Sequence, residues 1–584
     1  MNLSTLVQTH DPLQWLIALG PFVVLAALAA WLWRVGTEKG LGLPTWAGAG
    51  VVVGTWSLAV ALIGFHWDVG WHADLGRDAI LFTVAHTMIL IGLAGMGAAG
   101  ALAILLASLE RAPVGFRLRL AGRELRVPYS ALPLLLVSAG AQAGFPLDDW
   151  WHKTYGIDVT MWSPTHLMMI GGASLAPIAI WLMAAEAGPV GTAKARWWLA
   201  GAVLIGLSTF QLEFDFGIPQ FQLLFHPLLI VAAAGVGLVA ARAALGRGGA
   251  LAMVAGFLFL RLLVSVLVGP GFGHGFARFP LYLGEALAVE GAFLYFARWS
   301  SLALAAVSGL LAGVVGLATE WLWVNLWYQH PWGAPLLPYL GLALLMGPVA
   351  ATVGMAMGRV VGGGLAGVPA PAVALALAVM AGLLVIHLPA RQATPARLTM
   401  HSQQVGASHT VRDRNGVYSQ ARDILVTVDV NPPAAVRGSD WFELVAWQGG
   451  GVQHARLVET SPGHYRASGP VPVGGNWKVL VFNGRGDVVQ AAPVSMPPDP
   501  QYGLHEVPAP DNEGRAATFQ PASQLLMRES HGGSPLPALV AYTAFVALVA
   551  LWVAALGWAF QAVARQATTE PEPARRAARR PAIS

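Results

Sequence analysis

The sequence predicts an all-α polytopic membrane bundle of about thirteen transmembrane helices, partly arranged as tandem helical hairpins, with a β-sandwich inserted before the last helix. Two observations support this fold class. Of the 584 residues, 56% are hydrophobic and only 11% are charged, whereas soluble domains carry about 25% charged residues. Apolar stretches of about 20 residues, long enough to span a bilayer, also recur along the chain. This composition excludes a soluble enzyme or a soluble nucleic-acid-binding protein.

Thirteen ranges fit transmembrane helices. They are residues 13–33, 45–66, 79–107, 130–147, 163–184, 197–213, 222–241, 249–268, 280–297, 300–326, 336–357, 369–389 and 536–562. The first twelve make up a membrane domain at residues 1–390, which contains two similar hairpins at 45–107 and 130–184. Because the first range lacks the preceding basic residues of a cleaved signal peptide, we expect it to remain as a helix.

The basic residues predict how the chain is oriented. Alternate loops between the predicted helices hold thirteen Lys and Arg residues, and the intervening loops hold three. Cytoplasmic loops are the ones enriched in these residues. We therefore expect a multi-pass protein of a bacterial cytoplasmic (inner) membrane, with the N-terminus outside and the basic tail 563–584 inside. The surplus of basic residues then serves to orient the chain. The lipid bilayer is the expected partner of the protein, and no nucleic acid is expected.

Residues 391–535 form a polar, extracytoplasmic segment in this topology. Short alternating runs separated by Gly and Pro turns are typical of a small β-sandwich. The predicted strands are DILVTVDV, WFELVAWQ, HARLVE, HYRASG and WKVLVFNG. Residues 497–535 are rich in Pro, Asn, Gly and Ser, so we expect them to form a tether to the last helix.

A duplication carries the strongest functional signal. Residues 65–92 align without gaps on 145–172, and nine of 28 positions are identical. The identical polar pairs are Asp68/Asp148, Trp71/Trp151, His72/His152, Asp78/Asp158 and His86/His166. In each copy an Asp and a His four residues apart face the same side of a helix. The next helix carries the second His, which is expected about two turns into the membrane.

These residue types indicate a metal site. The chain has no Cys, and all sixteen His lie in the predicted outer half of the membrane or outside it. Imidazole and carboxylate donors suit copper, zinc and iron. The predicted ligands are Asp68, His72, His86, Asp148, His152 and His166. Neighbouring or additional polar residues are expected at Asp78, Asp158, His226, Glu285, Glu290, Glu320 and His330, with Trp71, Trp151 and Trp162 shielding the site.

Three other interpretations remain open. Haem could be held between helices by His86 with His166 or His226 as axial ligands. A buried transport path would use Glu285, Glu290, Glu320, Arg261 and His86. Aromatic and His side chains also gather at membrane interfaces for structural reasons alone. No hydrolase nucleophile, phosphate loop or dinucleotide motif occurs in a fitting context, so whether the protein is an enzyme is undecided at this point.

One resemblance concerns the polar segment. The string GHYRASGPVPVGGNWKVLVFNG, with Tyr465, Gly475 and Trp477, is similar to the small periplasmic domains of the FixH and YtkA type. This resemblance implies an immunoglobulin-like fold for the β-sandwich. It also implies an association with periplasmic metal-handling or oxidase proteins as partners.

A second resemblance concerns the membrane domain. Its string LDDWWHKTYGIDVTMWSPTHL is similar to uncharacterised polytopic bacterial membrane proteins. The Asp/His/His hairpin also resembles the copper site in one membrane subunit of copper membrane monooxygenases. The resemblance implies that Asp148, His152 and His166, with their counterparts in the first copy, are copper ligands. Catalysis, metal delivery and transport all remain open as uses of that metal.

Overall fold

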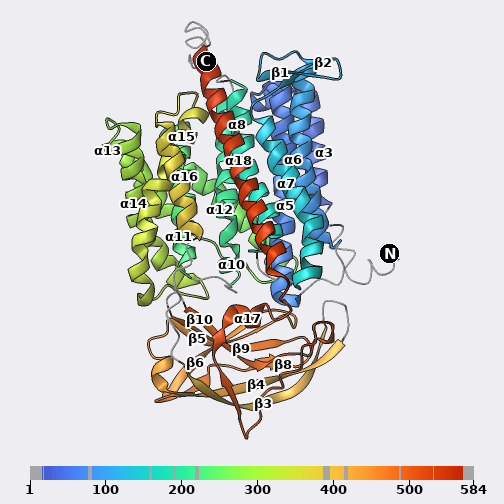
Figure 1. Cartoon of the computed structure of the whole chain (residues 1–584), viewed down its shortest axis with the longest axis vertical. Coiled ribbons are helices and arrows are strands. Elements are labelled where there is room, and N and C mark those ends of the chain that lie inside the picture. The colour runs from blue at the N-terminus through green and yellow to red at the C-terminus, as the bar shows by residue number, and fades with distance from the viewer. Residues whose placement is uncertain are drawn as a thin grey trace.

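The structure is a computed structural model that describes residues 16, 19–76, 82–156, 161–188, 192–217, 223–385, 395–412, 418–485, 488–530 and 532–569. Long helices run side by side in one part of the molecule, and a β-domain covers one end of them (Figure 1). The chain enters the β-domain after helix α16 and returns along the helices in α18. The elements thus follow the order of a helical part, a separate β-domain and a final helix.

The helical part contains these helices in chain order: α3 (Gly20–Val35), α4 (Thr37–Leu41), α5 (Thr45–Leu75), α6 (Val84–Leu109), α7 (Ala131–Tyr155), α8 (Pro164–Glu186), α9 (Thr192–Ser208), α10 (Leu212–Asp215), α11 (Phe225–Leu245), α12 (Gly249–Val266), α13 (Leu283–Tyr295), α14 (Ser301–Trp327), α15 (Leu340–Val361), α16 (Ala370–Val385) and α18 (Pro535–Thr569). Short 3-10 turns lie at Thr209–Gln211 and Ala334–Tyr339, and a π-turn extends α12 over Leu267–Gly271.

Nine helices of the described residues are long and apolar enough to cross a membrane, and two shorter apolar helices lie at Gly20–Leu32 and Ala370–Leu384. The chain is thus a multi-pass membrane protein. Helices α7 and α13 occupy the other two predicted ranges. With 13 residues, α13 is about 20 Å long, shorter than the hydrocarbon core of about 30 Å. The count of thirteen spans stays a prediction.

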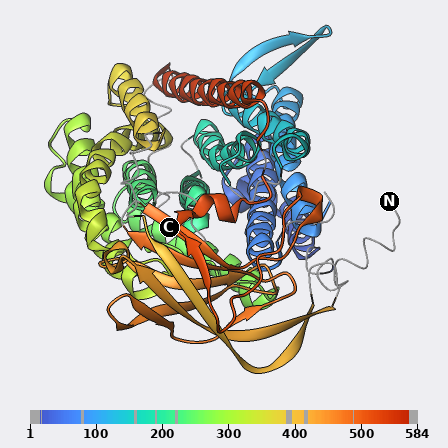
Figure 2. The same ribbon diagram turned by 60° about the horizontal axis from the view of Figure 1, so that its bottom comes forward.

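Helix α18 joins the bundle although it follows the β-domain in sequence. Its Trp552 is fully buried against Gly140 and Gly172 of the second hairpin, and at Gly140 only a glycine leaves room for the indole. The indole N–H donates a hydrogen bond to the carbonyl of Leu136 at 3.0 Å. Seen with the β-domain turned forward, α18 lies along the periphery of the helices (Figure 2).

The β-domain is one antiparallel, nearly closed sheet in the order β11-β3-β4-β7-β6-β5-β9-β10-β12, with β8 paired to β4. Its strands are β3 (Arg397–Arg412), β4 (Tyr418–Asn431), β5 (Trp441–Trp447), β6 (Gln453–Ser461), β7 (His464–Ala467), β8 (Val471–Val473), β9 (Lys478–Arg485), β10 (Val488–Ser495), β11 (Arg515–Thr518) and β12 (Gln520–Pro521). Alternate residues of β4, including Ile424, Val426 and Val428, face the core, as a half-buried strand requires.

The five predicted strands are confirmed as β4, β5, β6, β7 and β9. The predicted tether is more structured than expected, because part of it forms β11, β12 and the short helix α17 (Ala522–Leu526). Leu525 and Leu526 of α17 are buried in one cluster with Val445 and Phe482, so this helix covers one face of the sheet. The immunoglobulin-like assignment of the domain stays a prediction.

The opposite end of the helices carries a small hairpin, β1 (Phe116–Leu120) and β2 (Arg123–Val127). This hairpin holds four of the five Arg residues from the most basic predicted loop. It lies at the end of the bundle away from the β-domain, as does the C-terminal end of α18 (Figure 1). The predicted separation of the β-domain from this loop is therefore present, and the side that faces the cytoplasm stays a prediction.

Candidate metal centres

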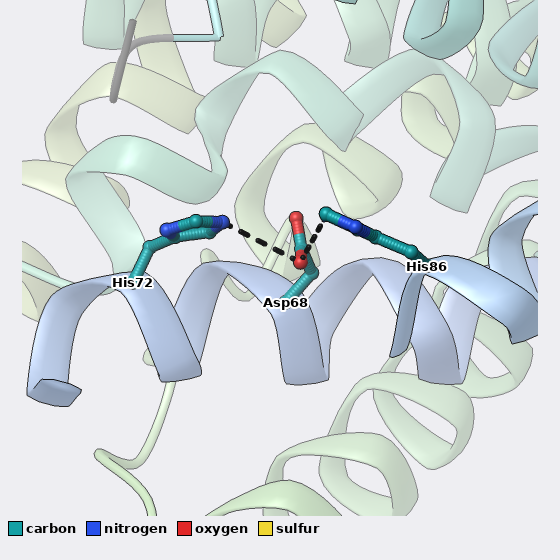
Figure 3. A group of neighbouring side chains, drawn as sticks. All are labelled: Asp68, His72 and His86. Atoms are coloured by element: carbon teal, nitrogen blue, oxygen red, sulfur yellow. Dashed lines mark ion pairs between the residues drawn. The ribbon is translucent and has the colours of Figure 1, made fainter. Parts of the chain in front are cut away.

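The first cluster lies where α5 ends and α6 begins. Asp68 and His72 are one turn apart on α5, and His86 reaches toward the same carboxylate from the start of α6 (Figure 3). The distances from Asp68 Oδ1 to the Nε2 atoms of His86 and His72 are 3.0 and 3.6 Å. Ligand atoms of the three side chains all lie within 4.8 Å of one another. The structure thus brings the three predicted ligands of the first copy together.

The second cluster repeats this arrangement at the junction of α7 and α8. Asp148 and His152 are on α7, and His166 is in the first turn of α8. The distances from Asp148 Oδ2 to the Nε2 atoms of His166 and His152 are 3.3 and 3.6 Å, and the donors again fit within 4.8 Å. The sequence duplication corresponds to two copies of one constellation.

Helix caps place the second His of each cluster. The hydroxyl of Thr83 accepts a hydrogen bond from the backbone N–H of His86 at 3.1 Å, and that of Ser163 accepts one from His166 at 3.2 Å. Such N-caps fix where a helix begins. Helix α6 begins at Val84 and α8 at Pro164, so both His sit in the first turn of their helices. Their depth in the membrane stays a prediction.

Glycines at equivalent positions complete the local geometry. Gly76 and Gly156 end α5 and α7 with φ values of 84° and 83°, a backbone region that favours glycine. Gly64 and Gly144 lie against the backbone carbonyl that precedes the cluster His of the facing helix, with no room for a side chain. The two helices of each hairpin therefore approach closely enough for the Asp to meet the second His.

The donor spacing fits a bound transition metal. Bonds of about 2.0–2.2 Å place two donors on one ion about 3–3.6 Å apart, which is the range of the four contacts, 3.0 to 3.6 Å. The 3.6 Å contacts of His72 and His152 are too long for hydrogen bonds. In the described part of the chain, His152 Nε2 is buried without a hydrogen-bond partner. Hydrogen bonding accounts for the contacts of His86 and His166, and a shared ion would account for all four contacts.

The two clusters differ in one supporting contact. Thr165 donates a hydrogen bond of 2.5 Å to Asp148 Oδ1 and thereby orients that carboxylate. The equivalent residue of the first copy is Ala85, which has no hydroxyl. The clusters are also neighbours, because Phe145 of the second hairpin packs on His86 with ring centroids 6.0 Å apart. The six side chains are 12 to 28% exposed, so an ion can reach them from the surface.

The β-domain and its tether contact the helices beside both clusters. Gln448 donates from its side chain to the carbonyl of His72 at 3.1 Å, and the N–H groups of Gly450 and Gly451 donate to the carbonyl of Asp74 at 3.0 and 3.1 Å. These bonds satisfy carbonyls at the end of α5 that a helix leaves free. At the end of α7, Tyr155 donates to the carbonyl of Ser534 at 2.8 Å.

A third group joins the two parts of the molecule. His330, which follows α14, and His454 of β6 both lie 3.1 Å from Glu443 Oε1 of β5, and the three could hold a metal ion by spacing. Both distances are ordinary hydrogen-bond lengths, so hydrogen bonding alone accounts for them. We therefore assign this group to docking of the β-domain.

Electrostatics agree with the docking assignment. Burial of Glu443 would by itself raise its pKa, but hydrogen bonds and charge attraction from His330 and His454 outweigh burial and lower that pKa to about 2. Burial also lowers the pKa of His330, against the opposing effect of Glu443. The ionised form of Glu443 is therefore stabilised where the two parts meet.

The other predicted residues that the structure describes have partners outside the two clusters. His226 is enclosed by aromatic rings: it stacks on Phe214 with ring centroids 4.8 Å apart, and its Nδ1 accepts a hydrogen bond from Trp332 at 3.2 Å. Trp162 donates to Glu213 at 2.7 Å. Asp78 and Asp158 lie outside the described residues.

The tryptophans predicted to shield the site have other neighbours. Trp71 contacts His274, with ring centroids 5.9 Å apart. Trp151 contacts Tyr155 and Tyr542, with ring centroids 4.4 and 6.0 Å apart. These contacts tie the ends of α5 and α7 to their surroundings, so shielding of the clusters by the two indoles stays a prediction.

The predicted transport path is divided into separate contacts. Glu290 forms an ion pair with Arg242 at 2.7 Å and accepts from the N–H of Ala250 at 3.0 Å. Arg261 contacts Asp215 at 2.5 Å and His66 at 2.6 Å. Neither group contains a residue of the two clusters, which argues against one continuous path through all five predicted residues.

Sequence reasoning missed several residues around the clusters. They are Thr83, Ser163, Thr165, Asp74, His274, Glu443 and His454. The caps could have been found, because Thr83 and Ser163 occupy the same position of the duplication and each precedes its His by three residues, as an N-cap would. His274 meets Asp74 at 3.0 Å across 200 residues of chain, and no local pattern indicates such a contact.

Comparisons with known proteins add no identity. No family model, curated protein or solved structure matches this chain.

Proposed function

We propose that this multi-pass protein resides in a bacterial cytoplasmic membrane and binds a transition metal, with copper as the first choice, at two Asp/His/His centres on its outer face. One observation carries the proposal. In both copies two imidazole nitrogens converge on one carboxylate oxygen, and each copy has the same 3.6 Å contact, too long for a hydrogen bond.

Copper is the favoured ion for chemical reasons. Nitrogen- and oxygen-donor sites bind Cu²⁺ more tightly than the other divalent first-row metals, and the absence of Cys removes the thiolates that commonly hold structural zinc. The resemblance of Asp148, His152 and His166 to a monooxygenase copper site points the same way. Zinc and iron would use the same donors.

Metal handling is the use that this geometry supports best. The cluster side chains remain partly exposed, and the β-domain contacts the helix end that carries the first cluster. An ion could therefore load from outside and pass to a periplasmic oxidase partner. Two His and one Asp also leave one position of a four-coordinate ion open, which oxygenase-type chemistry would require.

Haem binding is the alternative. An axial pair of His86 and His166 receives less support, because each imidazole already faces the carboxylate of its own cluster, at 3.0 and 3.3 Å. His226 receives less still, because Phe214 and Trp332 enclose its ring.

Elemental analysis and absorption spectra of purified protein test the proposal. We expect two copper ions per chain in the wild type, one in His86→Ala, one in His166→Ala and none in the double variant. His464→Ala is the matched control, because this exposed His lies on the β-domain and belongs to neither cluster. A wild type without metal, or variants that retain its full metal content, would exclude the ligand assignment. A Soret band that disappears in the variants would support haem instead.

A further inference from the structure

The helices beyond the metal clusters contain two buried carboxyl groups that the proposed metal function does not use. Glu285 is the third residue of α13, and Glu320 is on α14; both side chains are fully buried. The Glu285 carboxyl lies against Gly316, which is one turn before Glu320 on α14. Residues four apart on a helix share a face, so the two carboxyl groups face the same stretch of the α13–α14 interface, and they interact electrostatically.

The two groups have different partners. Glu320 Oε1 accepts two backbone hydrogen bonds, from Leu281 at 2.8 Å and from Tyr282 at 2.6 Å. Tyr282 has a positive φ of 57°, a conformation that is costly for a residue other than glycine. This bend directs both N–H groups at Glu320, and such donors favour the ionised form of a carboxyl.

Glu285 lacks donors from other described residues, and only its own backbone N–H acts on its carboxyl. Among the described residues, neither of its oxygens has a hydrogen-bond partner, and Glu320 Oε2 has none either. Buried polar groups without partners are rare and need an explanation. A charged carboxylate in the membrane interior is costly, and two close buried carboxylates are not both ionised.

Among the described residues, the surrounding charges do not supply a counter-ion. Besides each other, the titratable groups that act on the pair are Asp215, Tyr282 and Tyr328. The phenol of Tyr282 is hydrogen-bonded to Gln211 at 2.7 Å. Arg261 is already bound to Asp215 and His66, and Arg242 is bound to Glu290.

We propose that Glu285 and Glu320 form a proton-binding site inside the membrane domain, in which Glu285 carries the proton and Glu320 is the ionised partner. Binding of the proton leaves one negative charge on the pair, and that charge is held by the two N–H groups at the bend before α13. Intramembrane carboxyl pairs of this kind are suited to taking up and releasing protons. The site is separate from the metal clusters.

Infrared spectroscopy of the purified full-length protein tests the proton directly. We expect a protonated-carboxyl carbonyl band that disappears in Glu285→Gln and persists in Glu290→Gln, because Glu290 is ion-paired with Arg242 on the same helix. Absence of any such band, or a band that survives in Glu285→Gln, would overturn the proposal. Metal content should be unchanged in Glu285→Gln, so failure of the metal proposal and failure of this one are distinguishable.

Labelling with a hydrophobic carbodiimide, which reacts with protonated carboxyl groups, gives an independent readout. Peptide mapping should find the adduct on Glu285 and not on Glu290, which serves as an internal control five residues away. Glu285 should still be labelled in Glu320→Gln. Labelling that sodium ions suppress at constant pH would show that the pair holds a metal cation and would overturn the assignment of a proton.

Discussion

At the scale of single residues, the two clusters offer a natural comparison, because Thr165 supports Asp148 and its counterpart Ala85 has no hydroxyl to support Asp68. Groups that orient metal ligands typically change affinity by about 10- to 100-fold when removed. We predict that Thr165→Ala weakens copper binding at the second cluster about tenfold and leaves the first cluster unchanged.

Competition with a chelator of known affinity measures this effect in a His86→Ala background, where only the second cluster loads. Thr165→Ser keeps the hydroxyl and is the matched control. Equal affinities for the Ala and Ser variants would show that the hydrogen bond to Asp148 does not support the ligand.

The sequence predicts the cluster residues well and their supporting residues poorly. Asp68 and His72 are one helical turn apart, and a second copy at a fixed offset removes most of the ambiguity of such a pattern. Glu443 and His330 are 113 residues apart, so only the docking of the β-domain brings them together. Residues that act through long-range packing leave no periodic trace in the sequence.

At the scale of elements, the loop between β5 and β6 covers the end of α5 through the N–H groups of Gly450 and Gly451. Gly450 has a φ of 120°, so a side chain there strains the loop by about 1–3 kcal/mol. We predict that Gly450→Ala loosens this cover and speeds copper release from the first cluster without affecting the second.

Hydrogen exchange of the amides at 68–76, compared with those at 148–156, reports the loosening. Gly503→Ala is the control, since Gly503 also has a positive φ of 64° but its N–H donates to the carbonyl of Pro500 in a local turn and not to α5. Equal exchange in the wild type and Gly450→Ala would show that the loop does not protect the end of α5.

Elements were predictable where burial alternates clearly. Strand β4 was found because its core-facing residues are apolar, whereas β3 was missed because Leu398 and Met400 are buried but most of its later residues are exposed. An exposed strand lacks the alternation of apolar and polar residues by which a half-buried strand is recognised in a sequence. Helix α13 was predicted over 280–297 but begins only at Leu283, after the bend that presents two N–H groups to Glu320.

At the scale of the whole molecule, contacts between described residues hold the β-domain and its tether on the helices. Three of them are the loop over α5, the bond from Tyr155 to Ser534, and the group formed by Glu443 with His330 and His454. Only the last contains a residue whose ionisation is strongly stabilised by docking. Acid should therefore weaken this contact as Glu443 takes up a proton.

The sign of the pH dependence follows from Glu443. Its pKa falls from an ordinary 4.5 to about 2 in the folded protein, so its contribution to docking is complete above pH 4.5 and is lost as the pH falls toward 2. A shift of this size corresponds to at most about 3 kcal/mol. We predict that the β-domain loosens between these pH values, detected as faster hydrogen exchange in β5 and β6.

Glu443→Gln should flatten this pH dependence, whereas Glu513→Gln, at an exposed loop position, should retain it. A wild-type profile that Glu443→Gln leaves unaltered would place the acid-sensitive contact elsewhere.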